Sequence, residues 1–180
     1  ITAFSEHPLY TSFGEPISKT EAREKLGLDK EGKYLLFFGL IRRYKGLDLL
    51  LEAMGDQRIK AQQIKLIVAG EYYEDAGYYN EIIERLQLQN SVELHTRFIP
   101  DEEVKYYFSA CDLVTQTYHT ATQSGVTKIA LQFDKPSLVT DVGGLGEIIE
   151  HGKSGYVIPA DKVVIADSII DFYIQNRESG

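Results

Sequence analysis

Short, solidly hydrophobic runs alternate along the chain with stretches in which hydrophobic residues recur at helical spacing. The runs 34–40 (YLLFFGL) and 64–70 (IKLIVAG) are apolar at successive positions, which is typical of strands that are covered on both faces. Four shorter runs continue the series, at 92–96, 112–117, 137–140 and 156–159. The pattern therefore predicts about six strands.

Between these runs, apolar residues recur at i, i+3, i+4 and i+7, which predicts amphipathic helices. The stripes are Leu47, Leu50, Leu51 and Met54; Tyr79, Ile82, Ile83 and Leu86; Val104, Tyr107, Phe108 and Cys111; and Val126, Ile129, Ala130 and Phe133. Another helix is expected over 19–26. The alternation predicts an α/β fold, a Rossmann-like doubly wound parallel sheet of about six strands with helices on both faces.

Composition narrows the classes of function. The 19 Lys and Arg against 27 Asp and Glu give a net charge of −8, which argues against a nucleic-acid partner. Cys111 is the single cysteine, so an internal disulfide and a Cys-based zinc site are excluded, and a buried core thiol is the expected reading. The four histidines are scattered without metal-ligand spacing, and no metal is expected. A reducing, cytoplasmic location is predicted.

Ligands of doubly wound sheets bind beyond the carboxyl ends of the strands, so the residues that follow each run are the candidates. After the first run comes a glycine-bearing basic turn with Gly39, Arg42, Arg43 and Lys45. Its cations and the helix start that follows suit a diphosphate. An ordinary basic turn is the alternative.

The next two strand ends are less specific. Gly70 follows the second run and allows a close backbone approach. Phe98 and Ile99 follow the third run. Apolar residues at such a strand end can line a nucleobase site or can simply pack against the hydrophobic core. Asp101 is expected to cap the next helix.

The fourth run leads to a polar stretch that contains no carboxylate before Asp134. Its hydroxyls, amides and backbone N–H groups surround a predicted helix start and form a candidate anion cradle, since a carboxylate there would repel a phosphate. The cradle residues are Thr122, Gln123, Ser124, Gly125, Val126 and Thr127. His119 lies nearby and is read as a solvated loop histidine.

In order and spacing, four blocks resemble the C-terminal half of a GT-B glycosyltransferase of family 4, the retaining group 1 type. They are FFGLIRRYKGLDLLLEAM, IKLIVAGEYYED, VELHTRFIPDEEVKYYFSACDLV and DKPSLVTDVGGLGEIIEHGKSGYVIPAD, and the likeness covers residues 33–175. The resemblance implies that residues 33–180 form one nucleotide-sugar-binding domain, and that 1–32 are an inter-domain lead-in with a first helix. It also implies an N-terminal acceptor domain that this chain lacks.

By this resemblance, Lys45 matches a lysine that faces the donor diphosphate, and Lys45 and Arg42 are the expected catalytic residues. The family's arginine after the first glycine is replaced by Leu40. Its two glutamates ahead of the Lys-Pro pair fall on Ala121 and Ile129, so contact with the ribose must come from elsewhere. Whether activity is lost or only altered stays open.

The resemblance implies a hexosyl- or related transferase that acts on a glycan or lipid-linked acceptor in polysaccharide biosynthesis. The donor is a nucleotide-diphosphate sugar, no cofactor or metal is needed, and the fragment alone is expected to be inactive. Location at the inner face of the cell membrane, with peripheral contact through the missing domain, is left open.

Other classes of protein remain as alternatives. A non-catalytic nucleotide-sugar-binding or regulatory domain would explain Ala121 and Ile129 equally well. A flavodoxin-like module would need an acidic or flavin site where this chain has arginines. The sequence GEIIEHGKS is not a P-loop, because its glycines are wrongly spaced and it does not follow a strand.

Overall fold

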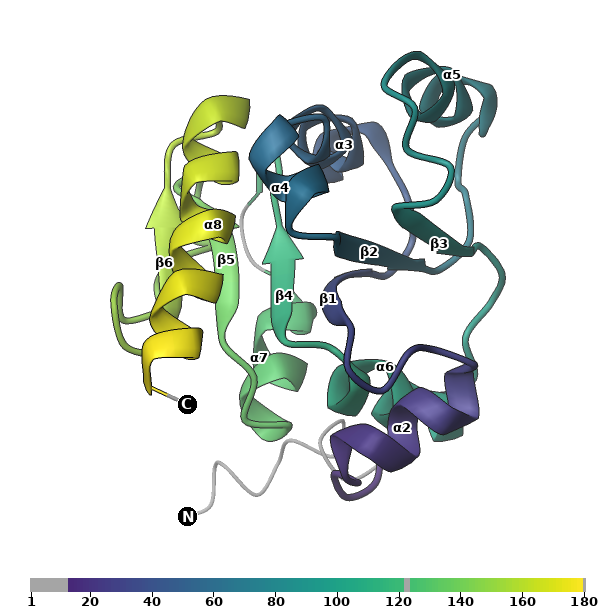
Figure 1. Cartoon of the computed structure of the whole chain (residues 1–180), viewed down its shortest axis with the longest axis vertical. Coiled ribbons are helices and arrows are strands. Elements are labelled where there is room, and N and C mark those ends of the chain that lie inside the picture. The colour runs from purple at the N-terminus through teal and green to yellow at the C-terminus, as the bar shows by residue number, and fades with distance from the viewer. Residues whose placement is uncertain (1–12, 122–123, 180) are drawn as a thin grey trace.

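Six parallel strands form one sheet in the order β3-β2-β1-β4-β5-β6 (Figure 1). The computed structural model describes residues 13–121 and 124–179. The strands are β1 (Lys33–Phe38), β2 (Ile64–Ala69), β3 (Val92–His95), β4 (Leu113–Gln116), β5 (Ser137–Thr140) and β6 (Gly155–Ile158). The chain runs outward from β1 to β3 and then outward from β4 to β6, which is the order of a doubly wound sheet. The predicted fold class is confirmed.

Helices connect β1 through β5 and cover both faces of the sheet, whereas β5 leads to β6 through turns. They are α2 (Lys19–Leu26), α3 (Leu47–Met54), α4 (Gln57–Ala61), α5 (Gly77–Arg85), α6 (Val104–Ala110), α7 (Gly125–Gln132) and α8 (Lys162–Ser179), with 3-10 turns η2 (Arg43–Lys45) and η3 (Asp101–Glu103). The four predicted stripes and the helix at 19–26 are confirmed, whereas α4 and α8 were not predicted. The capping role expected of Asp101 is wrong, because Asp101 lies inside η3, whose cap position is Pro100.

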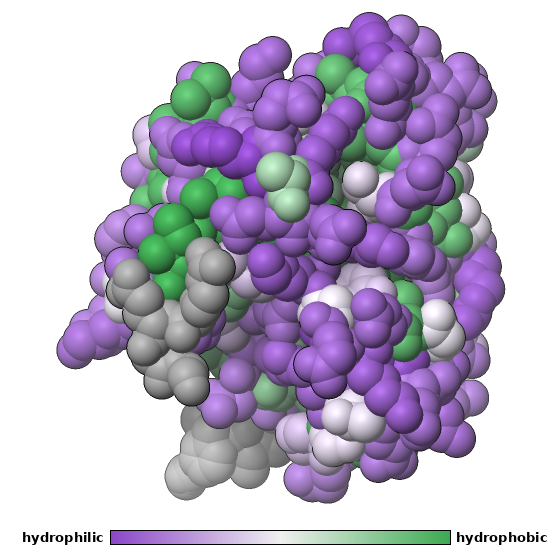
Figure 2. Space-filling view, in the orientation of Figure 1, coloured by the Kyte–Doolittle hydropathy of each residue, from purple (hydrophilic) through white to green (hydrophobic). Residues whose placement is uncertain are grey.

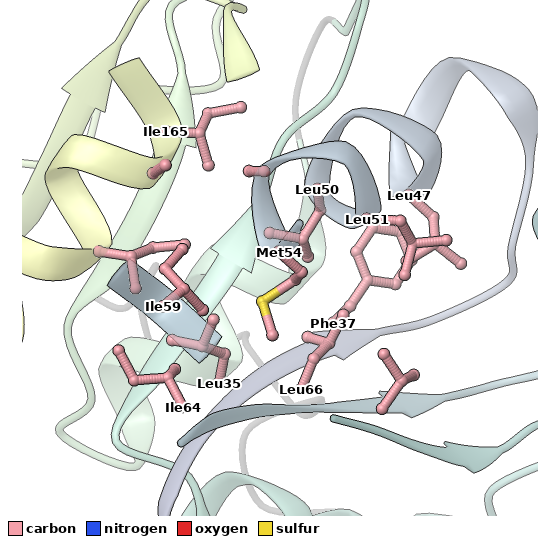
Figure 3. Packing of buried hydrophobic residues seen from close by; sticks show 14 of the residues in the cluster. Leu35, Phe37, Leu47, Leu50, Leu51, Met54, Ile59, Ile64, Leu66 and Ile165 are labelled. Atoms are coloured by element: carbon pink, nitrogen blue, oxygen red, sulfur yellow. The ribbon is translucent and has the colours of Figure 1, made fainter. Parts of the chain in front are cut away.

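Alternate residues of β1 enter two separate hydrophobic clusters. Leu35 and Phe37 pack with α3, α4, α5 and α8, whereas Tyr34 and Leu36 pack with α2, α6 and α7. Figure 3 shows the first cluster, in which Leu50 and Met54 of α3 point onto β1 and β2. Both faces of a parallel strand must be covered, and the solid apolar runs of the sequence reflect this.

Cys111 belongs to the second cluster and is fully buried, as predicted; burial raises the pKa of its thiol to about 12. The face seen in Figure 2 is mostly hydrophilic, with hydrophobic atoms in separate patches. Within the described ranges, no helix combines the length and the apolar character needed to span a bilayer.

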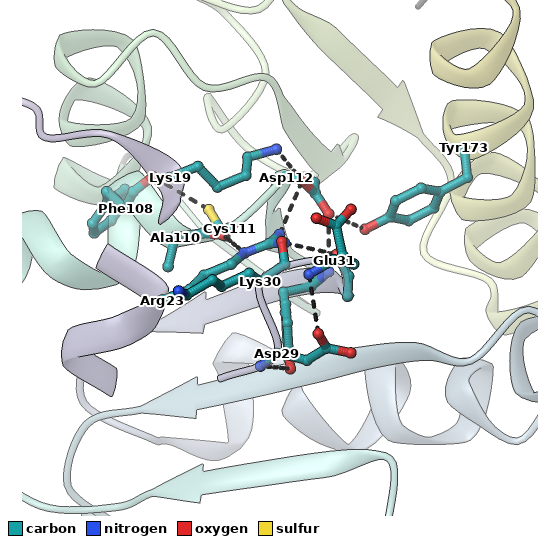
Figure 4. Close-up of polar contacts among 12 residues, drawn as sticks. Lys19, Arg23, Asp29, Lys30, Glu31, Phe108, Ala110, Cys111, Asp112 and Tyr173 are labelled. Atoms are coloured by element: carbon teal, nitrogen blue, oxygen red, sulfur yellow. Dashed lines mark hydrogen bonds and ion pairs between the residues drawn. The ribbon is translucent and has the colours of Figure 1, made fainter. Parts of the chain in front are cut away.

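Asp112, at the amino end of β4, joins both ends of the described chain to the sheet (Figure 4). Its Oδ2 accepts hydrogen bonds from the backbone N–H of Tyr34 in β1 and from the hydroxyl of Tyr173 in α8, each at 2.9 Å. Its Oδ1 lies 2.5 Å from Nζ of Lys19 and 3.3 Å from Nη2 of Arg23, both in α2. One carboxylate therefore ties two helices to two strands.

Arg23 is 2% exposed and is the largest fully buried side chain. Its guanidinium donates to three backbone carbonyls, those of Ala110, Lys30 and Gly32, at 2.8–2.9 Å. A buried cation is tolerated when every donor has an acceptor and a carboxylate is close. The first helix is thereby fixed to the sheet; the proposed boundary between 1–32 and 33–180 stays a prediction.

We expect Asp112→Ala to lower the free energy of unfolding by about 2–4 kcal/mol, because the substitution removes the carboxylate from a buried guanidinium and leaves the Tyr34 amide without its acceptor. Denaturant unfolding followed by circular dichroism measures the change. Asp167→Ala is the control, since Asp167 pairs with Arg58 on the exposed surface and its loss should matter far less. Equal effects of the two substitutions would contradict the role assigned to Asp112.

Candidate functional site

The carboxyl ends of β1 and β2 meet in a backbone contact that only glycine permits. Gly70 has a φ of +144°, and a Cβ atom there would lie 2.0 Å from the carbonyl oxygen of Gly39. The Gly39 amide in turn donates to the carbonyl of Ala69 at 2.9 Å. Both predicted site glycines are thus next to each other, and the two strands continue side by side to their last residue.

A cavity of about 250 Å³ opens beside this contact. It is lined by Phe38, Gly39, Leu40, Ala69, Gly70, Glu71, Phe98 and Ile99. Four predicted site residues, Gly39, Gly70, Phe98 and Ile99, therefore share one cavity, as their positions after successive strands suggested. Ile99 is nearly buried, whereas the ring of Phe98 is 65% exposed at the rim.

The Lys45 ammonium lies directly against Gly39. Its Nζ is 3.4 Å from the position that a Cβ atom on Gly39 would occupy, and a methyl group of Val126 in α7 is 4.0 Å from the same point. Burial, and secondly the charge of Arg42, lower the pKa of Lys45 below the ordinary lysine value. No carboxylate of the described residues pairs with Lys45 or Arg42. The structure therefore brings Lys45, Arg42 and the start of α7 together.

Arg43 points elsewhere. Its guanidinium carbon lies 3.5 Å from the ring centre of Tyr78 in α5, and its backbone N–H donates to a carboxylate oxygen of Glu74 at 3.0 Å. Of the two adjacent arginines, Arg42 is the one whose charge acts on Lys45, so the predicted site role of Arg43 has no support in this arrangement.

A second glycine contact fixes the basic turn to the loop after β4. Gly46 has a φ of +69°, and a Cβ atom there would lie 1.8 Å from the carbonyl oxygen of Thr117. The Thr117 hydroxyl donates to the Gly46 carbonyl at 2.8 Å, and the His119 amide donates to the Tyr44 carbonyl at 2.8 Å. The two segments that carry the predicted diphosphate site are therefore held together by their backbones.

Ser124, one of the predicted cradle residues, caps helix α7. Its Oγ accepts from the Val126 amide at 3.1 Å and lies 3.2 Å from the hydroxyl of Tyr118. These contacts use the Ser124 hydroxyl within the protein. The amides of Gly125 and Thr127 belong to the same first turn, whose N–H groups have no intrahelical acceptor, and they are the groups that can meet an anion.

The Thr127 side chain does not line the cleft. It is 1% exposed, and its Oγ1 accepts from Nε2 of Gln116 at 2.6 Å inside the protein. The predicted contribution of this hydroxyl to the cradle is therefore wrong, and only the amide remains available. Thr122 and Gln123, also predicted, lie outside the described residues.

Positions Ala121 and Ile129 both face apolar surroundings. Ala121 packs against the small cluster that includes Tyr118 and Val139, and Ile129 packs against the cluster beneath α7. Neither position points a hydrogen-bonding side chain into the cavity.

Three tyrosines around the site were not singled out from the sequence, and His119 was read as a solvated loop histidine. Tyr118 is almost buried beneath the α7 start, and burial raises its pKa. Tyr44 and Tyr73 flank Arg42 with their rings. His119 Nε2 contacts Asp48 at 2.9 Å, so this histidine is partly engaged and not simply solvated. All follow predicted strands, which is the signal that could have identified them.

Metal-ligating side chains do not gather in the described part of the chain: no group of three or more His, Cys, Asp or Glu residues there could hold an ion. The chemistry available at this edge comes from two cations, from backbone amides and from an apolar cavity. Such a combination suits an anion attached to a flat apolar group.

Known protein sequences that resemble this chain indicate the family to which the site belongs. The sequence model described as glycosyl transferases group 1 matches residues 18–179. The chain is 31% identical over 147 residues to D-inositol 3-phosphate glycosyltransferase of Segniliparus rotundus, a match that covers 79% of this chain and 32% of that protein. It is 30% identical over 159 residues to the lipopolysaccharide core biosynthesis mannosyltransferase LpsB of Rhizobium meliloti, covering 83% and 43% respectively. The chain thus spans less than half the length of these relatives.

Solved structures share the fold. The Anabaena protein HepE, crystallised in complex with UDP-glucose, superposes with a TM-score of 0.76 at 25% identity, over 95% of this chain and 46% of that one. The C-terminal domain of the group 1 glycosyl transferase LpcC from Francisella tularensis gives a TM-score of 0.76 at 20% identity, over 94% of this chain and 88% of that domain.

We expect Gly46→Ala to disturb the site, because the new methyl group would collide with the Thr117 carbonyl and the residue would keep a strained positive φ. A loss of at least 1–3 kcal/mol in the free energy of unfolding is expected, roughly the cost of such a backbone conformation. Gly125→Ala is the control, since a Cβ atom there meets nothing within 4 Å. Thermal and denaturant unfolding decide the matter; a Gly46→Ala protein as stable as the control would show that the contact yields easily.

Proposed function

The chain belongs to the group 1 glycosyl transferases, and from this premise we propose that it is the C-terminal, donor-binding domain of a retaining GT-B enzyme of family 4. The enzyme transfers a hexose or a related sugar from a nucleotide-diphosphate sugar to a glycan or lipid-linked acceptor. The observation that carries the proposal is the half-buried ammonium of Lys45, set against Gly39 beside a second cation and without a carboxylate partner in the described chain.

Electrostatics support a dianionic ligand at this place. Burial, and secondly the charge of Arg42, disfavour the charged form of Lys45 and lower its pKa, so holding the two cations at this place costs free energy. A diphosphate would remove this cost by neutralising both charges, and charge-assisted hydrogen bonds of this kind are among the stronger ones. The Gly125 and Thr127 amides at the start of α7 add donors aimed at the same region.

The mechanism follows from where charge develops during transfer. As the bond between the anomeric carbon and the diphosphate oxygen breaks, negative charge grows on the leaving diphosphate. Lys45 and Arg42 stabilise that charge together with the α7 amides, which is electrostatic catalysis that needs no metal in this proposal. The attacking hydroxyl is held by the acceptor domain, across the cleft from this edge of the sheet.

The nucleobase is assigned to the cavity beside Gly39 and Gly70. Its walls at Phe38, Ile99 and Ala69 are apolar, and the exposed ring of Phe98 can lie against a flat base. Glu71 is the acidic residue among the lining residues, so its carboxylate is our candidate for the ribose hydroxyls.

The rest of the proposed enzyme is inferred from the family. Residues 1–32 serve as the inter-domain lead-in and first helix, residues 33–180 bind the donor, and the acceptor domain precedes them. The proposed site of action is the cytoplasm, in polysaccharide biosynthesis. The formal net charge of −8 argues against a nucleic-acid partner, because the chain would repel the phosphate backbone.

A second candidate function rests on the apolar packing of Ala121 and Ile129. A domain that binds a nucleotide sugar without transferring it would need no carboxylates at these two positions. Sugar transfer by the longer protein would exclude this reading.

Lys45→Ala should weaken binding of a nucleoside diphosphate by about 1.5–3 kcal/mol, the range for hydrogen bonds to charged groups. Calorimetric titration with UDP, ADP and GDP, and with their monophosphates, measures the effect, and the diphosphates should bind better. Lys153→Ala is the control, because Lys153 is exposed and pairs with Glu150 away from the site. If the wild-type protein binds none of these diphosphates, the donor assignment is wrong. If a folded Lys45→Ala protein binds diphosphate as tightly as the wild type, Arg42 or Arg43 carries the contact.

We expect residues 1–180 to bind donor nucleotide but to transfer no sugar, because transfer needs an acceptor hydroxyl positioned against the anomeric carbon. The measurement is release of nucleoside diphosphate from radiolabelled donor sugars in the presence of candidate acceptors, with a longer protein that includes the preceding domain as the positive control. Robust transfer by residues 1–180 alone would refute the two-domain proposal.

A further inference from the structure

Arg42 stays beside Lys45 although the two side chains repel each other. The Lys45 amide donates to the Arg42 carbonyl at 2.9 Å, so both side chains leave one tight turn, and the charge of Arg42 adds to burial in lowering the pKa of Lys45. Within the described chain, the Arg42 side chain has no carboxylate partner that would hold it. A mobile arginine in this position would turn toward solvent, and something else must therefore restrain it.

Two aromatic rings supply that restraint. The guanidinium carbon of Arg42 lies 4.2 Å from the ring centre of Tyr73 and 5.6 Å from that of Tyr44. Both distances are within the range of cation–π attraction, and arginine favours such contact because its planar group can lie flat on a ring.

The backbone places these rings accurately. Beyond the ends of β1 and β2, Ile41 forms an isolated parallel bridge with Tyr72. The Ile41 amide donates to the Glu71 carbonyl at 2.8 Å, and the Tyr73 amide donates to the Ile41 carbonyl at 3.0 Å. Arg42 and Tyr73 follow the two bridged residues in the chain, so the backbone pairing places them next to each other.

Tyr44 is anchored independently. Its carbonyl accepts from the His119 amide at 2.8 Å, and its ring meets Tyr118 edge to face, with ring centres 6.0 Å apart. Tyr118 in turn contacts the Ser124 hydroxyl at the start of α7. The ring on the second side of Arg42 is thus tied to the same helix start that we propose for the diphosphate.

We infer that Tyr73, assisted by Tyr44, is a positioning residue that clamps the Arg42 guanidinium beside Lys45 and so completes a two-cation site for the diphosphate of the donor. This inference rests on the proposed function. The neighbouring Arg43 has its own ring, Tyr78, on the far side of the turn. In this proposal the contacts with Tyr73 and Tyr78 hold Arg42 toward the ligand site and Arg43 away from it.

The exposure of the Tyr73 and Tyr44 rings distinguishes a positioning role from a role in packing the core. Tyr73 is 59% exposed and Tyr44 is 41% exposed, so neither ring is needed to fill the core. Substitution of Tyr73 should accordingly leave the stability of the fold nearly unchanged and affect the ligand.

The test combines substitutions at Tyr73 and Arg42 with calorimetric titration of UDP, ADP and GDP, and of UMP, AMP and GMP. Tyr73→Ala should weaken diphosphate binding about three- to tenfold, in line with the strength of an exposed or partly desolvated cation–π contact, and should leave monophosphate binding nearly unchanged. Tyr73→Phe should retain wild-type affinity because the ring face is kept. Tyr106→Ala is the matched control, since Tyr106 lies near Lys105 in α6 and away from the site.

A double-mutant cycle makes the test specific. Arg42→Ala combined with Tyr73→Ala should bind diphosphate no more weakly than Arg42→Ala alone, because the ring acts through the arginine. Additive losses would mean that Tyr73 contacts the nucleotide itself, and wild-type affinity in Tyr73→Ala would remove the clamp; either result overturns the inference while leaving the donor site in place. Failure of the wild-type protein to bind any diphosphate would reject the proposed function and the clamp together.

Discussion

Two backbone contacts that leave no room for a Cβ atom determine how this edge of the sheet is built. Gly70 meets the Gly39 carbonyl, and Gly46 meets the Thr117 carbonyl. The first brings the ends of β1 and β2 together beside the cavity, and the second joins the basic turn to the loop that leads into α7. Lys45, Arg42 and Glu71 lie on segments that these contacts fix, whereas Phe98 and Ile99 reach the cavity from the end of β3. The site therefore depends on main-chain geometry before any side chain takes part.

This geometry explains why two cations can be held together without a carboxylate. In a flexible loop, Lys45 and Arg42 would separate, and the electrostatic cost would disappear with them. Here the turn is tied at both ends and aromatic rings flank the arginine, so the repulsion persists and adds to burial in lowering the pKa of Lys45. An anion that enters relieves it. Preorganised charge of this kind requires no rearrangement when the ligand binds, which is the condition for efficient electrostatic stabilisation.

The sequence predicted the parts that depend on local pattern. Solid apolar runs identified all six strands, and the rule that ligands meet strand ends placed Gly39, Gly70, Phe98 and Ile99 in one cavity. It placed both Arg42 and Arg43 at the site and could not show that Arg43 lies on the ring of Tyr78 while Arg42 lies near that of Tyr73, because both rings come from beyond β2. It also misjudged the hydroxyl of Thr127, which Gln116 draws inward. Helix α8 was not predicted, although its buried residues Ile165, Ile169 and Phe172 recur at helical spacing.

The Asp112 cluster has a consequence for the order in which the protein folds. Its partners in α2 lie 89 and 93 residues away in the chain, and Tyr173 of α8 lies 61 residues away in the other direction. Contacts of such long range require the closure of large loops, and closure costs chain entropy before it yields any contact energy. We therefore expect the carboxylate to gain these partners after β1 and β4 have paired. We expect α2 and α8 to dock late in folding, as the step that locks a sheet already formed.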